Sequence, residues 1–381
     1  MPTHPFRVLI APDSFKSTLT AAAAAAAMAA GVRQACPDAV PEELPVADGG
    51  EGTVAAVVAA GGQEQAVEVP DALGRPVLAR FAVLGDTAVI ESAKACGLHQ
   101  VTVGPEAALA SSSAGVGRLI RAALDLGYRR LVVGLGGTAG TDGGAGMASE
   151  LGVRFTGRNG AALPPGGGWL AELAAIDASG LDPRLPGCEV RIACDVTSPL
   201  LGPSGAAAVF GPQKGAGPAE VDRLAAGLAR YADLVRQVRG IEIGALPGGG
   251  AAGGLGAGLV AFAGGRLDSG IDYLLRVLGV ADRLAGCALV LTGEGSLDAQ
   301  SLAGKAPVGV ARLAAEHGVP VLAVAGRVEL DSAAVTAAGF AGAYPASADG
   351  RLPADPASAL AMATARAVRD WLSRVEAPCG R

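Results

Sequence analysis

The stretch LVVGLGGTAGTDGGAGM at residues 131–147 governs how the rest of the chain is interpreted. It begins as a short apolar run that is typical of a buried strand. It then becomes rich in glycine, with Thr138, Thr141 and Asp142 between the glycines. Because glycine has no Cβ atom, consecutive backbone N–H groups can converge on one anion. The stretch therefore predicts either an anion-binding loop after a strand or a closely packed strand-to-helix turn.

Three further stretches have the same character and favour the anion-binding interpretation. They are DGGEGT at residues 48–53, PGGGAAGGLGAG at 247–258 and TGEGSLD at 292–298. Each lies near the predicted end of a strand or helix, and several of these glycine loops carry acids. Together they indicate a cleft that handles phosphate groups.

Composition limits the function classes. With 381 residues the chain is too long for one ordinary core, so two domains are expected. Aromatic residues make up only 3% and the net charge is -6, which disfavours stacking on bases and binding to a nucleic-acid backbone. The six cysteines form no CxxC pair, which excludes the usual zinc spacings and predicts a reducing, cytoplasmic location. The alanine run at residues 21–27 is expected to be a helix of a cytoplasmic protein and not a membrane span.

Lysine occurs only four times among 30 basic residues. Three of the four lysines, Lys16, Lys214 and Lys305, lie in segments that resemble turns. A compact ammonium group suits a phosphate or a small acid better than a planar guanidinium does. These lysines are therefore candidates for ligand binding, and an ordinary solvated charge is the alternative for each.

Polar loops follow the predicted strands. The strand at residues 8–11 leads into Asp13, Ser14 and Lys16, where open α/β sheets place their ligands. A second strand, at 42–47, precedes the loop that begins at Asp48 and contains Glu51. These two acids could bind a cation or polyol hydroxyls, or could only cap the following helix.

A third strand, at residues 190–194, delivers Asp195 beside a glycine-rich segment. An aspartate at the exit of a strand is a candidate for a general base or a metal ligand. The alternative is that its carboxylate only bonds the amides of its own turn.

The order of the predicted elements indicates an α/β fold with two domains. Alternating stretches at residues 65–98, with turns at Gly74 and Gly85, predict antiparallel hairpins that open an inserted domain. Strands separated by helices at both ends of the chain predict one parallel sheet. We therefore expect residues 1–66 and 281–381 to form a discontinuous, three-layer Rossmann- or flavodoxin-like domain. Residues 67–280 are expected to form an inserted mixed α/β domain.

The available chemistry favours phosphoryl transfer. The three histidines lie outside every loop described above, and no GxSxG elbow, GxxxxGK[ST] loop or protein-kinase motif is present. Carboxylates, glycine-loop amides and lysines remain. Amides and lysine can hold phosphate charge, and an aspartate can orient an acceptor hydroxyl.

The motifs together resemble the bacterial class I glycerate kinase family. They are APDSFKSTLTA, PVADGGEGTV, GLGGTAGTDGGAGM, ACDVTSPLLGPSGAAAVFGPQKGA, GAAGGLGAGL and LTGEGSLDAQSLAGKAPVGVA, spread in family order over nearly the whole chain. The resemblance implies a two-domain α/β kinase with its active site in the cleft between the domains. It also implies ATP, Mg²⁺ and D-glycerate, with 2-phosphoglycerate as the product. The chain departs from the family pattern at Gly140-Thr141 and at Ser198, which affects side-chain hydrogen bonds and not the class.

The resemblance and the chemistry together suggest roles for individual residues. Asp195 would be the base or the orienting carboxylate, and Lys16 with Ser14 would hold the glycerate carboxylate or the transferring phosphate. Glu294 and Asp298, with Asp48 as a further candidate, would hold Mg²⁺ directly or through water. The remaining expected contacts are with the nucleotide for Gly136, Gly137, Thr138, Asp142 and Lys214, and with glycerate for Asp13, Asp48, Gly49, Gly50, Glu51 and Lys305.

Several alternatives stay open at this level. A kinase that forms 3-phosphoglycerate, or one that acts on a related hydroxy acid or sugar acid, would need the same loops. A non-catalytic sensor of small hydroxy acids would also use them, although it would not need the carboxylates. The oligomeric state is open, a homodimer included, and neither nucleic acid nor membrane is expected as a partner.

Overall fold

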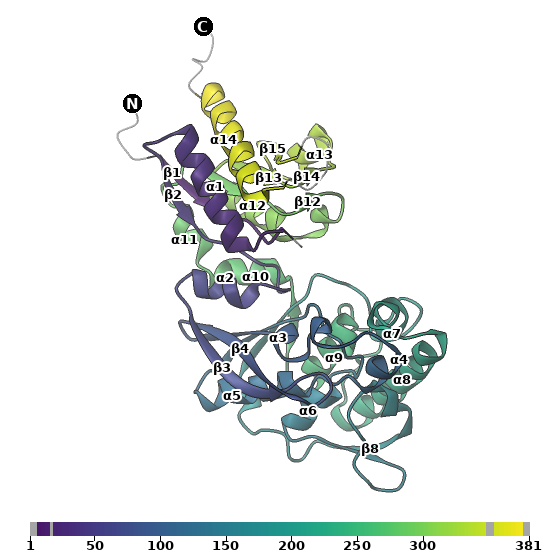
Figure 1. Cartoon of the computed structure of the whole chain (residues 1–381). Helices are drawn as coiled ribbons and strands as arrows, with labels where there is room; N and C mark the ends of the chain where they lie inside the picture. Colours follow the sequence, from purple (N-terminus) through teal and green to yellow (C-terminus); the bar gives the residue numbers. More distant parts are fainter. Residues whose placement is uncertain (1–5, 16–17, 348–353, 376–381) are drawn as a thin grey trace. The chain divides into compact units, whose positions relative to one another are not determined.

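The computed structural model describes residues 6–15, 18–347 and 354–375 and shows a mixed α/β fold (Figure 1). Contacts between Cα atoms divide the chain into two compact units. Unit 1 contains the chain up to Asp48, Ala55–Gly61 and the chain from Ile271 onward. Unit 2 contains Gly49–Val54 and Gly62–Gly270. The predicted boundaries at 66/67 and 280/281, and the predicted site between two domains, stay predictions.

Unit 1 is built on a sheet of five parallel strands in the order β15-β13-β11-β1-β2. The strands are β1 (Arg7–Ile10), β2 (Val40–Glu43), β11 (Leu289–Thr292), β13 (Val321–Ala325) and β15 (Gly342–Pro345). The three central strands are almost entirely buried and apolar, as expected for a parallel sheet covered by helices. The predicted parallel pairing of the first and last parts of the chain is confirmed.

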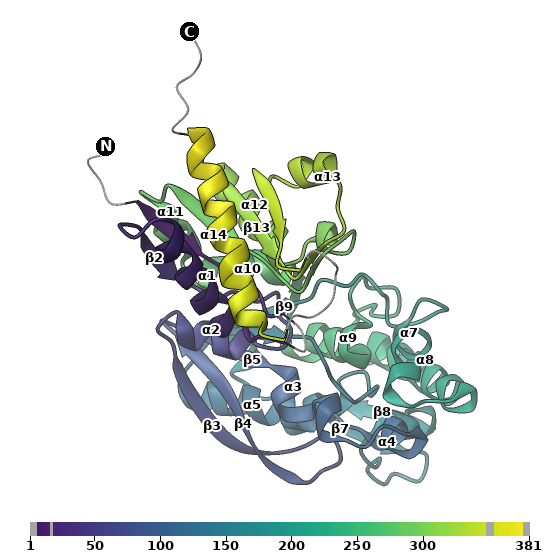
Figure 2. The ribbon, with the colours of Figure 1, turned by 45° about the horizontal axis from the view of Figure 1, so that its top comes forward.

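Two long helices pack together on this sheet. They are α1 (Ala21–Ala35) and α14 (Pro356–Val375), which lie side by side in Figures 1 and 2. The Thr20 side chain accepts a hydrogen bond from the Ala23 amide at 3.1 Å and so caps the start of α1. At Gly31 a Cβ atom would lie only 2.3 Å from the Ala361 carbonyl oxygen. Small residues on α1 therefore permit the close approach of α14.

The other elements of unit 1 are short. They are α2 (Thr53–Ala59) and α10 (Gly270–Val277), which both begin in unit 2, α11 (Val280–Leu284), α12 (Ala306–Glu316), α13 (Ser332–Ala337), β12 (Ser296–Leu297) and β14 (Arg327–Val328). The prediction of a strand at residues 42–47 was wrong in its limits. The amides of Leu44 and Val46, beyond β2, still donate to the carbonyls of Ile10 and Pro12. Because Pro12 has no N–H to donate in the opposite direction, the strand pairing ends early.

Unit 2 contains a six-stranded mixed sheet in the order β10-β9-β6-β5-β4-β3. The strands are β3 (Gln63–Pro70), β4 (Pro76–Leu84), β5 (Thr87–Glu91), β6 (Arg130–Gly134), β9 (Glu189–Ala193) and β10 (Arg266–Asp268). β3, β4 and β5 pair antiparallel, with positive φ at the turn residues Gly74 and Gly85, as predicted. β5 also pairs with β6 in parallel, which the sequence analysis did not predict.

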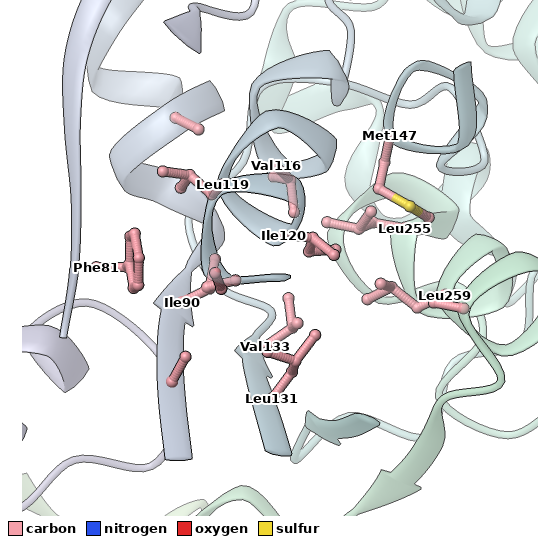
Figure 3. Close-up of a cluster of buried hydrophobic side chains, with 14 of the residues drawn as sticks. Phe81, Ile90, Val116, Leu119, Ile120, Leu131, Val133, Met147, Leu255 and Leu259 are labelled. Carbon is pink, nitrogen blue, oxygen red and sulfur yellow. The ribbon is translucent and has the colours of Figure 1, made fainter. Parts of the chain in front are cut away.

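The core of unit 2 lies between this sheet and its helices (Figure 3). Ile90, Leu131 and Val133 project from the central strands toward Leu119 and Ile120 on α5 (Ala114–Asp125). Met147 of α6 (Ala145–Glu150) and two leucines of α9 (Ala251–Ala263) complete the cluster. A second cluster contains Phe155, Tyr231 and Phe262, whose rings lie 6.0–6.5 Å apart.

Six further α-helices and strands of unit 2 supply other residues of these two clusters. They are α3 (Ser92–Cys96), α4 (Pro105–Ala110), α7 (Ala206–Phe210), α8 (Pro218–Arg239), β7 (Arg154–Gly157) and β8 (Leu173–Asp177). Among the described residues, none of the helices is long and apolar enough to cross a membrane.

The glycine-rich stretch at residues 247–258 leads into the buried helix α9, but Ala252, Gly253 and Gly254 have positive φ values of 52°, 68° and 92°, so the regular part of the helix starts only after them. Cβ atoms at Gly254 and Gly258 would lie 2.7 Å and 2.9 Å from the Cα atoms of Gly143 and Gly144. Glycine here serves the close packing of a helix against the central loop. The expectation that this stretch forms another phosphate-binding loop stays a prediction.

Candidate functional site

The four parallel strands of unit 2 end at one level. Glu91 pairs with Gly134, Gly134 with Ala193, and Ala193 with Asp268, so their carboxyl ends form one edge. The loops that leave this edge include residues 135–144 after β6 and 194–198 after β9. Carboxyl ends of parallel strands are the usual ligand sites of open α/β sheets.

The turn at residues 49–52 and the first two residues of α2, together called the 49–54 loop below, lie across this edge. A Cβ atom on Gly134 would lie 2.1 Å from the Gly49 carbonyl oxygen, and one on Gly136 would lie 2.9 Å from the Gly50 Cα atom. The Val54 amide donates to Glu91 Oε2 at 3.2 Å. Glycines on both segments therefore allow the two predicted loops, 49–54 and 135–144, to touch backbone to backbone.

Asp142 is buried inside the central loop, with 1% of its surface exposed. Its carboxylate accepts hydrogen bonds from the Ser113 amide and hydroxyl, at 2.8 Å and 2.9 Å, and from the Ser112 hydroxyl at 3.4 Å. The amides of Gly144 and Gly146 donate to it at 3.0 Å and 3.1 Å. These bonds give Asp142 a role in shaping the loop and joining it to the start of α5; its predicted contact with the nucleotide stays a prediction.

Lys214 contacts the backbone of the same loop. Its buried ammonium group donates to the Gly140 carbonyl at 2.5 Å. Burial lowers the pKa of Lys214 to about 8, and the nearby Cys96 and Asp142 oppose that change. The Lys214 side chain thus contacts the loop backbone, while its predicted role in nucleotide binding stays a prediction.

The predicted anion-binding residues Gly136, Gly137 and Thr138 lie in the first part of the central loop, directly after β6. Gly137 has a φ of +64°, and its carbonyl accepts from the Leu98 amide at 2.7 Å. Thr138 and Thr141 are buried, and neither hydroxyl has a hydrogen-bond partner among the residues that the structure describes. Polar groups buried in this way are commonly satisfied by water or a ligand.

Asp195 follows β9 and is exposed. Its Oδ1 atom accepts a hydrogen bond at 3.1 Å from the amide of Gly270, which follows β10, and this bond orients the carboxylate. The structure therefore places Asp195 at the same sheet edge as Gly136 and the 49–54 loop.

Unit 1 presents a second set of predicted residues at the carboxyl edge of its own sheet. The Asp13 amide donates to the Gly293 carbonyl at 2.9 Å, which joins the loops after β1 and β11. Asp13 Oδ1 accepts from the Ser14 amide at 2.6 Å. Lys16 lies outside the described residues. Asp48 is half-buried in the same unit.

The loop after β11 holds a compact polar cluster. Glu294 accepts from the Ser301 hydroxyl at 2.5 Å and from the Lys305 ammonium at 3.3 Å. Burial raises the pKa of Glu294, and Ser301 and Lys305 offset only part of that rise. Burial also raises the pKa of Asp298, but the amides of Gln300 and Ser301 outweigh it, so its pKa lies below the ordinary value.

Comparison with known proteins identifies these motifs. The profile of the Glycerate kinase family matches residues 8–372. The chain belongs to the glycerate kinase family. It is 44% identical over 328 residues to glycerate 2-kinase of Escherichia coli K12, covering 85% of this chain and 86% of that protein. It is 46% identical over 334 residues to a glycerate kinase of Bacillus subtilis 168, covering 86% and 87% of the two chains.

A solved structure agrees with this assignment. A crystal structure from Salmonella typhimurium LT2, provisionally assigned as glycerate kinase 2, superposes with a TM-score of 0.86 at 42% identity. The alignment covers 98% of this chain and all of that one. The family resemblance seen in the sequence is thereby confirmed.

The glycerate kinase motifs fall into two spatial groups. Unit 2 brings together Gly49, Gly50, Gly136 and Asp195 at one sheet edge. Unit 1 brings together Glu294, Asp298 and Lys305, and separately joins Asp13 to the loop before Glu294.

The fit of Mg²⁺ to the Glu294 cluster can be judged from the donor set. Within the described ranges, no group of three or more histidine, cysteine, aspartate or glutamate side chains forms a metal-binding arrangement. Magnesium needs only one or two protein carboxylates when nucleotide phosphates and water supply its other ligands. A carboxylate with a lowered pKa, such as Asp298, fits that requirement, whereas both oxygens of Glu294 already accept hydrogen bonds.

Sequence reasoning missed two residues. Glu91 was treated as part of a hairpin strand, although it is a buried acid at the sheet edge. Ser301 was not predicted, although its hydroxyl donates a hydrogen bond to Glu294 and accepts one from the Asp298 amide. An isolated acid at the end of an apolar strand, immediately before a helix, is the signal that could have identified Glu91.

Proposed function

We propose that the protein is an ATP- and Mg²⁺-dependent kinase that phosphorylates D-glycerate on its C2 hydroxyl. The observation that carries this proposal is the 44% identity with glycerate 2-kinase of Escherichia coli over 85% of the chain. The glycine loops support it, because the 49–54 loop and the loop after β6 meet at a sheet edge beside Asp195. Unit 1, with helices packed on an entirely parallel sheet, would be the Rossmann-like domain.

The residues of unit 2 would act on the acceptor and the transferring phosphate. Asp195 would accept or orient the C2 hydroxyl proton, since its carboxylate is exposed and held by the Gly270 amide. The amides of Gly136, Gly137 and Thr138 would face the phosphate oxygens. Asp48, Gly49, Gly50 and Glu51 would bind the hydroxyls of glycerate.

The residues of unit 1 would hold charge. Lys305 already pairs with Glu294, and Lys16 with Ser14 and Asp13 would contact the glycerate carboxylate or the phosphate. Asp298 would hold Mg²⁺ directly, and Glu294 would do so through water, since Ser301 and Lys305 occupy its oxygens. When bound, the cation would neutralise charge on the nucleotide phosphates.

The proposal is tested by measuring ADP release from purified protein with ATP and Mg²⁺, with and without D-glycerate. NMR of the product then locates the phosphate. Release that depends on glycerate, with phosphorus coupling to the C2 proton, is the expected result. Coupling to the C3 protons would retain the kinase and refute the position of transfer. Glycerate binding without ADP release would refute the kinase and favour a sensor.

A further inference from the structure

Glu91 has an unusual environment for an acid. It is the last residue of β5, only 1% of its surface is exposed, and it is level with Gly134 at the sheet edge. Its Oε2 atom accepts from the Val54 amide, whereas its Oε1 atom has no hydrogen-bond partner in the described structure. Oε1 lies 3.8 Å from the Lys94 ammonium group. Burying a carboxyl group this incompletely bonded is costly, so stability alone does not explain it.

The segment that Glu91 holds is rich in glycine. Three of the six residues in the 49–54 loop are glycines, which add conformational freedom and no side-chain contacts. The loop closes on itself through the Thr53 hydroxyl, which donates to the Gly50 carbonyl at 2.7 Å. Glu91 attaches the end of that closed loop to the sheet.

We propose that Glu91 is a positioning residue for the 49–54 loop and that Lys94 is its counter-charge. The inference rests on the proposed function, because the loop is assigned there to glycerate. A carboxylate at this edge holds the loop against Gly134 and Gly136, so that Gly49, Gly50 and Glu51 are ordered before the substrate arrives. Preorganisation of this kind reduces the cost of binding.

The charges around Glu91 make the role dependent on pH. Burial raises the pKa of Glu91, while Lys94 on α3 and the amide of Val54 lower it, and Glu51 in the loop raises it. Removing the charge of Lys94 would therefore raise the pKa of Glu91 further. Protonation would weaken the bond to the Val54 amide, and the loop would loosen at a higher pH than in the wild type.

The test compares Glu91→Ala, Glu91→Gln and Lys94→Met with Glu68→Gln, which changes an exposed acid on β3 of the same unit. We expect Glu91→Ala to raise the KM for D-glycerate about tenfold, with the KM for ATP changed less than about twofold. Hydrogen exchange of the amides of residues 49–54 should accelerate in the same variant. Glu91→Gln should recover part of the loss, since its carboxamide oxygen can still accept from Val54, and Glu68→Gln should match the wild type.

The pH dependence separates positioning from a general loss of packing. In Lys94→Met the fall in glycerate affinity on the acid side should move to higher pH, and in the double variant Glu91→Gln/Lys94→Met this movement should be absent. Unchanged glycerate KM and unchanged exchange in both Glu91 variants would overturn the proposal. If the wild type shows no glycerate-dependent ADP release, the proposed function fails, and the exchange measurement alone decides whether Glu91 orders the loop. If Glu91→Ala does not fold, the near-isosteric Glu91→Gln supplies the same comparison.

Discussion

Replacing Gly134 with alanine tests the central geometric claim, that the glycines at the end of β6 let the 49–54 loop lie on the sheet edge. A Cβ atom at residue 134 would be 2.1 Å from the Gly49 carbonyl oxygen and 3.0 Å from the Gly49 carbonyl carbon. Ordinary carbon–oxygen contacts are about 3.3 Å or longer, so the loop backbone would have to move by about 1.2 Å. Backbone cannot yield as a flexible side chain does.

The expected cost follows from that displacement. Overpacking of this size destabilises a protein by about 1–3 kcal/mol, and Tm should fall by about 2–4 °C for each kcal/mol in a unit of this size. The effect on catalysis should be larger, because a misplacement of about 1 Å at a binding loop can reduce the rate about 100-fold. We therefore expect kcat/KM for D-glycerate to fall about 10- to 100-fold in Gly134→Ala while the protein stays folded.

The matched control is Gly187→Ala. Gly187 lies in the same unit, and a Cβ atom there would meet no atom within 4 Å. Steady-state kinetics and thermal unfolding of the two variants, measured side by side, give the comparison. Equal kcat/KM values for Gly134→Ala and Gly187→Ala would refute the close approach of the two glycine loops as a requirement for activity.

Three further substitutions test the site and the fold. Asp195→Asn should lower kcat about 10²- to 10⁴-fold with little change in the KM for glycerate, and near-wild-type turnover would refute its role as base or orienting carboxylate. Lys214→Met removes a buried ammonium whose folded pKa is about 8, against an ordinary value of 10.5. Between these values the unfolded chain binds more protons than the folded one. The free energy of unfolding of the wild type, measured by urea titration, should therefore rise by up to about 3 kcal/mol relative to that of the variant as pH rises from 8 to 10.5. A difference that stays constant with pH would contradict this. Tyr231→Phe removes a buried hydroxyl that has no partner among the described residues and should raise Tm, whereas a fall would show that water satisfies the hydroxyl.

The elements with strong local signals could be predicted from sequence. The alanine run at residues 21–27 predicted helix α1, and the glycines at 74 and 85 predicted the turns between β3, β4 and β5. Each of these signals is contained in a few neighbouring residues. The helix α9 was not predicted because its helical glycine Gly258 packs against Gly143 and Gly144, which are distant in sequence. Local propensity disfavours glycine in a helix, and tertiary packing overrides it here.

Which acids shape the site was a harder question for the same reason. Glu91 ends an apolar strand, and Asp142 and Asp195 lie in the loops after two others, but the neighbouring residues do not show which of these acids is buried. Asp142 became a buried, multiply bonded residue only because the serines that precede α5 reach its carboxylate. Glu91 became buried because the 49–54 loop, from an earlier part of the chain, covers the end of β5. Register and loop contacts between distant segments therefore decide the environment of each acid.

That difference in environment suggests a division of labour along one sheet edge. Asp142 and Glu91 are buried and bonded to amides of the two glycine loops, so they can fix backbone geometry but have little access to a substrate. Asp195 is exposed and is oriented by the Gly270 amide, so it can meet a substrate hydroxyl without further rearrangement. A kinase has little covalent chemistry to perform and depends on donors and acceptors held in place before the reaction. Buried acids that order glycine-rich backbone, beside an exposed acid that faces the acceptor, meet that requirement because glycine supplies the close approach and the carboxylates remove the disorder that glycine brings.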